Sequence, residues 1–96
     1  MVSINDELEA AKAAKAAIEF LLTTSPKAMV VATLNKAKYA AVLNLSSGGA
    51  LNEARTSVGI ALSNLIHGMP TQEKIDKAKR VIEAWIRELE ASPALK

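Results

Sequence analysis

Residues 71–93 read TQEKIDKAKRVIEAWIRELEASP, and the spacing of their apolar side chains decides the fold class. Apolar residues recur every three or four positions while Lys, Arg and Glu fill the positions between them, which indicates a helix with one buried face. Thr71 is a favourable N-cap, and Ser92-Pro93 ends the segment. We therefore predict a helix over 72–91 that buries Ile75, Ala78, Ile82, Trp85, Ile86 and Leu89.

Three clusters of turn-forming residues, 23–26, 46–49 and 68–71, divide the rest of the chain. In the first, Ser25 can cap a helix whose first position is Pro26, where the missing N–H costs nothing. In the other two, Gly48 or Gly49 and then Gly68 are expected to adopt the left-handed conformation that ends a helix. The predicted helices span 5–22, 26–46, 50–67 and 72–91.

These four segments have nearly equal lengths, about 27–31 Å at 1.5 Å per residue, and short connections. Equal helices joined by short turns pack as antiparallel neighbours, so we predict an all-α, up-down-up-down four-helix bundle. The length of 96 residues, half of them apolar, fits a single domain covering 1–96.

Composition excludes several classes of function. The chain has no cysteine and therefore no disulfide framework, thiol nucleophile or cysteine metal site, and its net charge of +2 is too small to favour nucleic acid or an anionic membrane. The start of the sequence lacks the basic and apolar regions of a secretory signal. We expect a soluble, cytoplasmic protein.

The first and last helices are predicted to be amphipathic outer walls. For the first, Ser3 or Asn5 is the expected N-cap, and the acidic residues Asp6 and Glu7 suit the positive end of the helix dipole. Its expected core positions are Leu8, Ala11, Ile18, Leu21 and Leu22, and its expected solvent positions are Glu7, Glu9, Lys12, Lys15 and Glu19.

The middle of the chain is poor in charge. Residues 26–67 carry five charged side chains, against 17 in the other 54 positions. On a helical wheel, residues 26–46 present two apolar arcs, although a helix in a simple bundle needs only one. The first arc, expected in the core, holds Val30, Leu34, Ala37, Ala41 and Leu45; the second holds Val31, Ala32, Asn35, Tyr39, Val42 and Leu43.

The helix over 50–67 shows a related pattern. Its expected core stripe is Leu51, Ala54, Val58, Leu62, Leu65 and Ile66, and its opposite side is small, polar and uncharged: Asn52, Thr56, Ser57, Gly59, Ile60, Ser63, Asn64 and His67. Small residues four apart allow two helix backbones to approach closely. The alternative is a solvated helix whose residues simply have poor helix propensity.

In style the sequence resembles a computationally designed helical bundle. The resemblance rests on the Ser25-Pro26 start, the glycine stops, the absence of cysteine, and the texture of TQEKIDKAKRVIEAWIRELEASP and NDELEAAKAAKAAIEFLL. It covers the first and last helices and implies no catalytic residues. The middle helices depart from it, because an idealised design would place Glu and Lys at exposed positions.

The chain offers little for catalysis, and we predict that it is not an enzyme. His67 is the only histidine; Ser63 lies one turn before it, but an orienting acid is missing because Asp6 and Asp76 lie near helix starts. We expect no cofactor. Because a haem needs only one axial histidine, a haem-like cofactor with His67 as its axial ligand stays open as the alternative. The sequence shows no metal-binding motif.

We predict self-association into a homo-oligomer, most simply a dimer, through the two middle helices. The expected contact residues are Asn35, Tyr39, Thr56, Ser57, Gly59, Ile60, Ser63 and Asn64. The alternative is a small-molecule or cofactor pocket with Tyr39, Asn35, Asn64 and His67 as polar groups. A groove for a different protein is a third reading that the sequence does not separate from the first.

Overall fold

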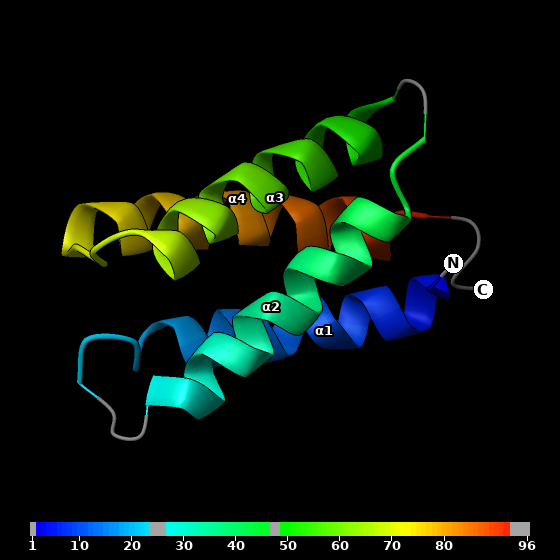
Figure 1. Cartoon of the computed structure of the whole chain (residues 1–96). Helices are drawn as coiled ribbons and strands as arrows, with labels where there is room; N and C mark the ends of the chain where they lie inside the picture. The colour runs from blue at the N-terminus through cyan, green and yellow to red at the C-terminus, as the bar shows by residue number, and fades with distance from the viewer. Residues whose placement is uncertain (1, 24–26, 47–48, 93–96) are drawn as a thin grey trace.

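The computed structural model of the chain describes residues 2–23, 27–46 and 49–92. It contains four helices in these ranges: α1 (Ile4–Ile18), α2 (Lys27–Leu43), α3 (Ala50–His67) and α4 (Gln72–Glu90). Successive helices run in opposite directions, and each packs against two neighbours in the cyclic order α1–α2–α3–α4 (Figure 1). The all-α, up-down-up-down four-helix bundle predicted from the sequence is confirmed, with extents of 38 × 19 × 19 Å.

The start signals of α1 and α4 act as predicted. The Ser3 hydroxyl accepts a hydrogen bond from the Asp6 amide, and the Thr71 hydroxyl accepts one from the Lys74 amide. Each bond satisfies a backbone donor that has no partner inside the helix. The predicted Ser25-Pro26 start of α2 and Gly48 stop lie outside the described residues.

Two helices end earlier than predicted. α1 ends at Ile18 rather than 22, because the chain then tightens into turns in which the Leu21 amide donates to the Ile18 carbonyl. This tightening buries Leu21 and leaves Leu22 41% exposed, so the prediction of Leu22 as a core residue was wrong. α2 ends at Leu43 rather than 46, and Leu45, also predicted as core, is 41% exposed.

Gly68 corrects another prediction. Its backbone is extended rather than left-handed, with φ −124°. The chain leaves α3 without a left-handed residue there and passes straight toward the cap of α4. Gly49, with φ 89°, is the glycine whose conformation an L side chain rarely adopts.

The core confirms the α4 prediction, since all six expected residues are buried and Trp85 is completely enclosed. Alanines of α1 and α2 are buried in the same core, and such small side chains permit close approach of packed helices. Within the described residues, no helix combines the length and apolar character needed to cross a bilayer.

Candidate functional site

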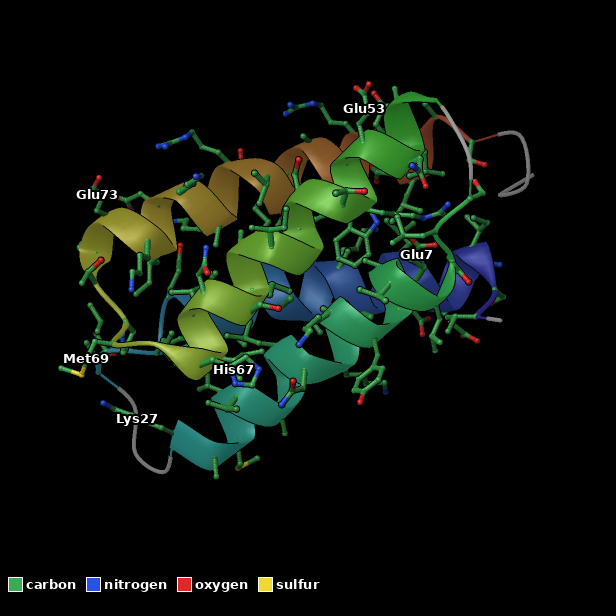
Figure 2. All side chains as sticks on the ribbon, turned by 45° about the horizontal axis from the view of Figure 1, so that its top comes forward. Glu7, Lys27, Glu53, His67, Met69 and Glu73 are labelled. Atoms are coloured by element: carbon green, nitrogen blue, oxygen red, sulfur yellow. The ribbon has the colours of Figure 1, made fainter. Side chains whose placement is uncertain are left out.

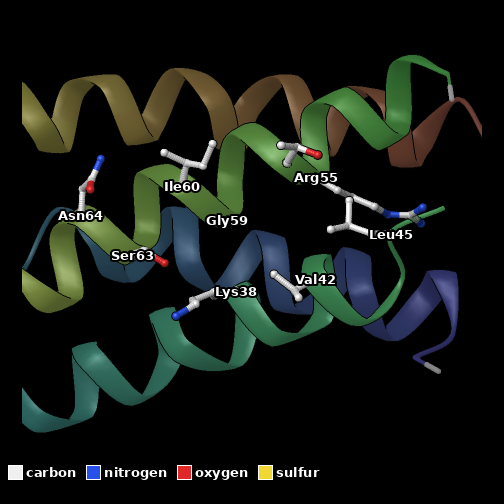
Figure 3. A pocket seen from close by; sticks show the side chains of 9 residues that line it. Lys38, Val42, Leu45, Arg55, Gly59, Ile60, Ser63 and Asn64 are labelled. Carbon is white, nitrogen blue, oxygen red and sulfur yellow. The ribbon is translucent and has the colours of Figure 1, made fainter. Parts of the chain in front are cut away.

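A groove between α2 and α3 is the main concave feature of the surface predicted to make contacts (Figure 3). Its volume is about 360 Å³, within the range of small-ligand pockets. We call it the α2–α3 groove. Its lining residues are Lys38, Val42, Leu45, Arg55, Thr56, Gly59, Ile60, Ser63 and Asn64.

Gly59 of α3 lines the groove opposite Val42 of α2. A methyl group added at its Cα would meet Val42 Cγ2 at 3.4 Å, an ordinary van der Waals contact. Packing between α2 and α3 therefore does not require a glycine here. The low helix propensity of Gly59, about 0.8–1 kcal/mol worse than Ala, is left unexplained by contacts within the chain.

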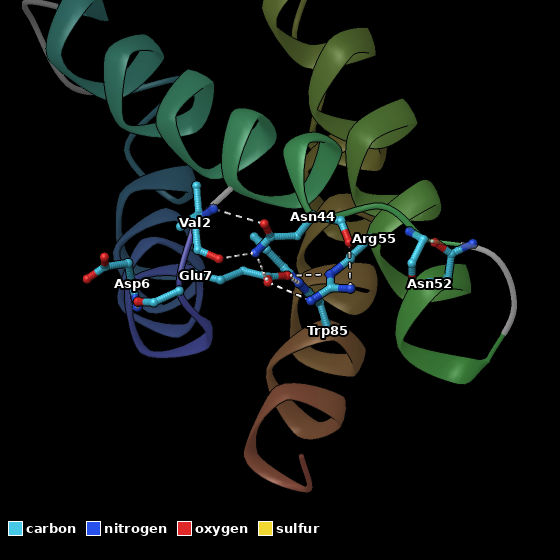
Figure 4. Close-up of polar contacts among 9 residues, drawn as sticks. Val2, Asp6, Glu7, Asn44, Asn52, Arg55 and Trp85 are labelled. Atoms are coloured by element: carbon cyan, nitrogen blue, oxygen red, sulfur yellow. Dashed lines mark hydrogen bonds and ion pairs between the residues drawn. The ribbon is translucent and has the colours of Figure 1, made fainter. Parts of the chain in front are cut away.

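A buried polar cluster lies beneath one end of the groove (Figure 4). The Glu7 carboxylate is fully buried and accepts four hydrogen bonds: from Asn44 Nδ2 at 2.7 Å, Arg55 Nη2 at 2.7 Å, Arg55 Nε at 2.8 Å and Trp85 Nε1 at 2.7 Å. The four residues come from or directly follow all four helices. We call them the Glu7 cluster.

The cluster also fixes the beginning of the described chain. Asn44 exchanges two hydrogen bonds with Val2: its Nδ2 donates to the Val2 carbonyl at 2.7 Å, and its Oδ1 accepts from the Val2 amide at 3.0 Å. Arg55 Nη1 donates to the Asn44 carbonyl at 2.8 Å, near the end of α2. Among the described residues, no buried side-chain nitrogen or oxygen lacks a partner. The cluster is therefore a completed network that holds four helices together.

The sequence pattern does not predict this cluster, and it places Glu7 among the solvent-facing residues of the first helix. That prediction was wrong because Glu7 occupies the same helical stripe as the buried Ala10, Ala11, Ala14 and Ile18. Arg55 and Asn44 likewise fall on the buried stripes of α3 and α2. Opposite charges on the buried stripes of two helices were the signal for a buried pair.

Comparison with protein-family models, curated proteins and solved structures finds no match. The site therefore has to be interpreted from its own geometry.

The six predicted contact residues of α3 line hollows on both sides of that helix. Thr56, Gly59, Ile60, Ser63 and Asn64 line the α2–α3 groove. Ser57, Ile60 and Asn64 line a hollow of about 190 Å³ between α3 and α4, and Ser57 also lines a neighbouring one of about 260 Å³.

The two predicted contact residues of α2 line none of these hollows. Tyr39 is 63% exposed and Asn35 is half-buried. We call the eight predicted residues together the α2–α3 surface.

Part of the polar character of α3 has a local explanation. The Asn52 Oδ1 accepts a hydrogen bond from the Ser46 amide at 2.8 Å, which ties the chain after α2 to the first turn of α3. The Thr56 hydroxyl donates to the Asn52 carbonyl at 3.0 Å within the same helix. These two residues have structural roles that the neutral composition alone did not reveal, whereas Ser63 and Asn64 have no such hydrogen bond in the described chain.

His67 lies at the last residue of α3, toward the opposite end of the bundle from Glu7 (Figure 2). It is exposed and is not among the residues that line the groove. The described chain forms no hydrogen bond between its ring and Ser63. The groove and His67 are therefore separate features, and the polar groups expected in one pocket do not converge.

Proposed function

We propose that the protein acts by assembly in the cytoplasm rather than by catalysis, forming a homo-oligomer through the α2–α3 surface. A symmetric dimer is the expected state, because two-fold contacts are the commonest in soluble homo-oligomers. The observation that carries the proposal is the exposure of large apolar side chains on and just after α2. In the described chain these are Met29, Tyr39, Val42, Leu43 and Leu45.

The bundle buries the first apolar arc of α2 apart from Leu45, and it leaves most of the second arc uncovered. Val30, Leu34 and Ala37 are enclosed, while Tyr39 and Leu43 are 63% and 56% exposed. Tyr39, Val42 and Leu43 fall within five consecutive positions of α2, and exposed apolar side chains clustered in this way typically mark an interaction site. A second copy covering it would remove these side chains from water at about 25 cal/mol per Å² of apolar area.

The side of α3 that borders the groove favours close approach of a second copy. Gly59 and Ser63 are small and half-buried, and Ile60 beside them is 61% exposed. Large apolar groups next to small residues allow a partner's side chain to enter between them. Tyr39 adds an aromatic group, a residue type enriched at protein interfaces.

Light scattering of variants tests this proposal. Tyr39→Glu and Gly59→Glu place a charge on the α2–α3 surface, and each is expected to reduce the oligomer to a monomer without loss of helical circular dichroism. Met69→Glu is the matched control, because Met69 is 81% exposed but lies between α3 and α4. An oligomer that survives both surface variants, or that the control disrupts equally, contradicts the proposal.

A small-molecule site in the α2–α3 groove is the second candidate, favoured by the mainly apolar lining of this hollow of about 360 Å³. The haem form of this hypothesis requires ligation by His67, which is exposed and outside the groove. A haem titration tests it: a Soret shift that His67→Ala abolishes supports ligation, and a shift unchanged by that substitution excludes it.

A further inference from the structure

The α2–α3 groove contains a positive charge that the described chain does not neutralise. Lys38 is half-buried there, and its ammonium has no hydrogen-bond or ion-pair partner among residues 2–23, 27–46 and 49–92. None of the nine lining residues is Asp or Glu. The second cation of the groove, Arg55, is already paired with Glu7. The groove is therefore electrostatically complementary to an anion that contacts Lys38.

Two side chains that can hold an anion, Lys38 and Ser63, lie toward one end of the groove. In Figure 3 the side chains of Lys38 and Ser63 extend from facing helices into the space at one end, and Val42 and Leu45 lie farther toward Arg55. From Ser63 to Arg55 the groove runs for about 12 Å along α3 at 1.5 Å per residue. This length accommodates an extended eight-carbon chain, which advances by about 1.3 Å per C–C bond.

We propose that the α2–α3 groove binds a medium-chain carboxylate. Lys38 Nζ and the Ser63 hydroxyl donate to the carboxylate, and the alkyl chain packs on Val42, Gly59 and Ile60. Gly59 presents no side chain to the groove, so the alkyl chain can lie against the α3 backbone beside Val42. An ammonium paired with a carboxylate in a partly desolvated groove forms a charge-assisted hydrogen bond, stronger than a neutral one.

The inference does not depend on self-association, although the two use overlapping residues. A carboxylate in the groove and a second copy on the α2–α3 surface compete for Gly59, Ile60 and Ser63. Tyr39 distinguishes self-association from carboxylate binding, because it belongs to the α2–α3 surface but does not line the groove. Octanoate binding that persists in Tyr39→Glu supports the groove site independently of the oligomeric state, and loss of binding in that variant contradicts it.

Isothermal titration of the full chain with three ligands tests the chemistry directly. We expect saturable one-to-one binding of octanoate, at least about tenfold weaker binding of octanol, and no measurable binding of acetate. Octanol retains the alkyl chain without the charge, and acetate retains the charge without the chain. Equal affinity for octanoate and either comparison ligand, or no saturable octanoate binding, overturns the proposal.

Two lysine variants locate the site. Lys38→Met is expected to weaken octanoate binding about tenfold, while Lys36→Met, an exposed lysine on the same helix outside the groove, leaves it unchanged. Gly59→Leu fills the groove and is expected to abolish binding while circular dichroism shows an intact bundle. Equal losses in the two lysine variants, or full affinity in Gly59→Leu, place the ligand elsewhere and overturn the proposal.

Discussion

Replacing Glu7 by Gln probes the interaction that joins all four helices. The substitution keeps the shape of the side chain but turns one acceptor oxygen into an NH2 group. If the amide oxygen replaces Oε1, the NH2 group faces Arg55 Nε and Trp85 Nε1, which now donate to Oε2 at 2.8 and 2.7 Å. Two buried donors lose their acceptor, and the guanidinium loses its counter-ion.

The expected cost follows from these contacts. A buried donor left without an acceptor costs about 1–3 kcal/mol, and removal of one member of a buried ion pair costs about 3–5 kcal/mol in total. Domains of this size are stable by about 5–15 kcal/mol, so Glu7→Gln is expected to leave the bundle marginally stable. Urea unfolding followed by the fluorescence of Trp85, the single tryptophan, measures the loss within the cluster itself.

Glu9→Gln is the matched control, since Glu9 is exposed on the same helix and its substitution is expected to change stability by less than about 0.5 kcal/mol. The double variant Glu7→Met/Arg55→Met completes the comparison. Removing both charges is expected to cost less than the sum of the two single substitutions, because each single substitution leaves one buried charge unpaired and the double substitution leaves none. A loss from Glu7→Gln no larger than that from Glu9→Gln, or strictly additive losses, refutes this reasoning.

Three further substitutions test separate parts of the account. Gly59→Ala is expected to raise the stability of the isolated chain by up to about 1 kcal/mol in urea unfolding, and a loss would show that α2–α3 packing needs the glycine. Thr71→Ala should cost about 1 kcal/mol by the same assay through loss of the α4 cap; no change would mean that the cap is unimportant. The exposed Glu19 carboxylate accepts a hydrogen bond from Lys79 Nζ at 2.8 Å, which together with the charge of that ammonium lowers the pKa of Glu19. NMR titration should show this pKa rising toward its ordinary value in Lys79→Met, and an unchanged pKa would contradict the pairing.

The Glu19–Lys79 pair also fixes the sign of its pH dependence. Because the folded-state pKa of Glu19 lies below its ordinary value, its contribution to stability is present above that ordinary value and is lost as pH falls through the lowered pKa. The pKa of Lys79 is raised by the same hydrogen bond, so its contribution is lost at alkaline pH. Glu19 is exposed and Lys79 is only partly buried, so the effect on stability is expected to be small.

The helix pattern of this chain follows from local signals. Ser3 and Thr71 cap α1 and α4 because hydroxyls at those positions reach the free amides of the first turn. Trp85 falls on a continuous apolar stripe, which identifies it as a core residue. These features depend on residues within a few positions of one another, so the sequence reveals them directly.

The Glu7 cluster depends on contacts between distant residues. Glu7 and Arg55 are 48 positions apart, and each alone resembles an ordinary surface charge at a helix start. Their burial becomes predictable only when the two are considered as partners on facing stripes. The early end of α1 has a similar cause, because burial of Leu21 in the assembled core stabilises the tighter turn after Ile18.

The lining of the groove was likewise predictable from the sequence only in part. The unusual composition of α3 points to Gly59, Ile60 and Ser63, whereas Lys38 is not among the predicted contact residues because a lysine on a helix is usually solvated or snorkelling. Its half-burial opposite Ser63 arises from the way α2 and α3 pack. The sequence therefore indicated the α3 residues that line the groove, and the fold revealed that Lys38 adds a positive charge to it.

Sedimentation equilibrium of the unmodified protein, over tens to hundreds of micromolar, tests most directly whether a second copy covers the α2–α3 surface. The account predicts a mass that rises with concentration toward a multiple of the 10.2 kDa of one chain, most simply twice that value. A mass of 10.2 kDa at every concentration would contradict it, because Tyr39 and Leu43 would then remain in contact with water.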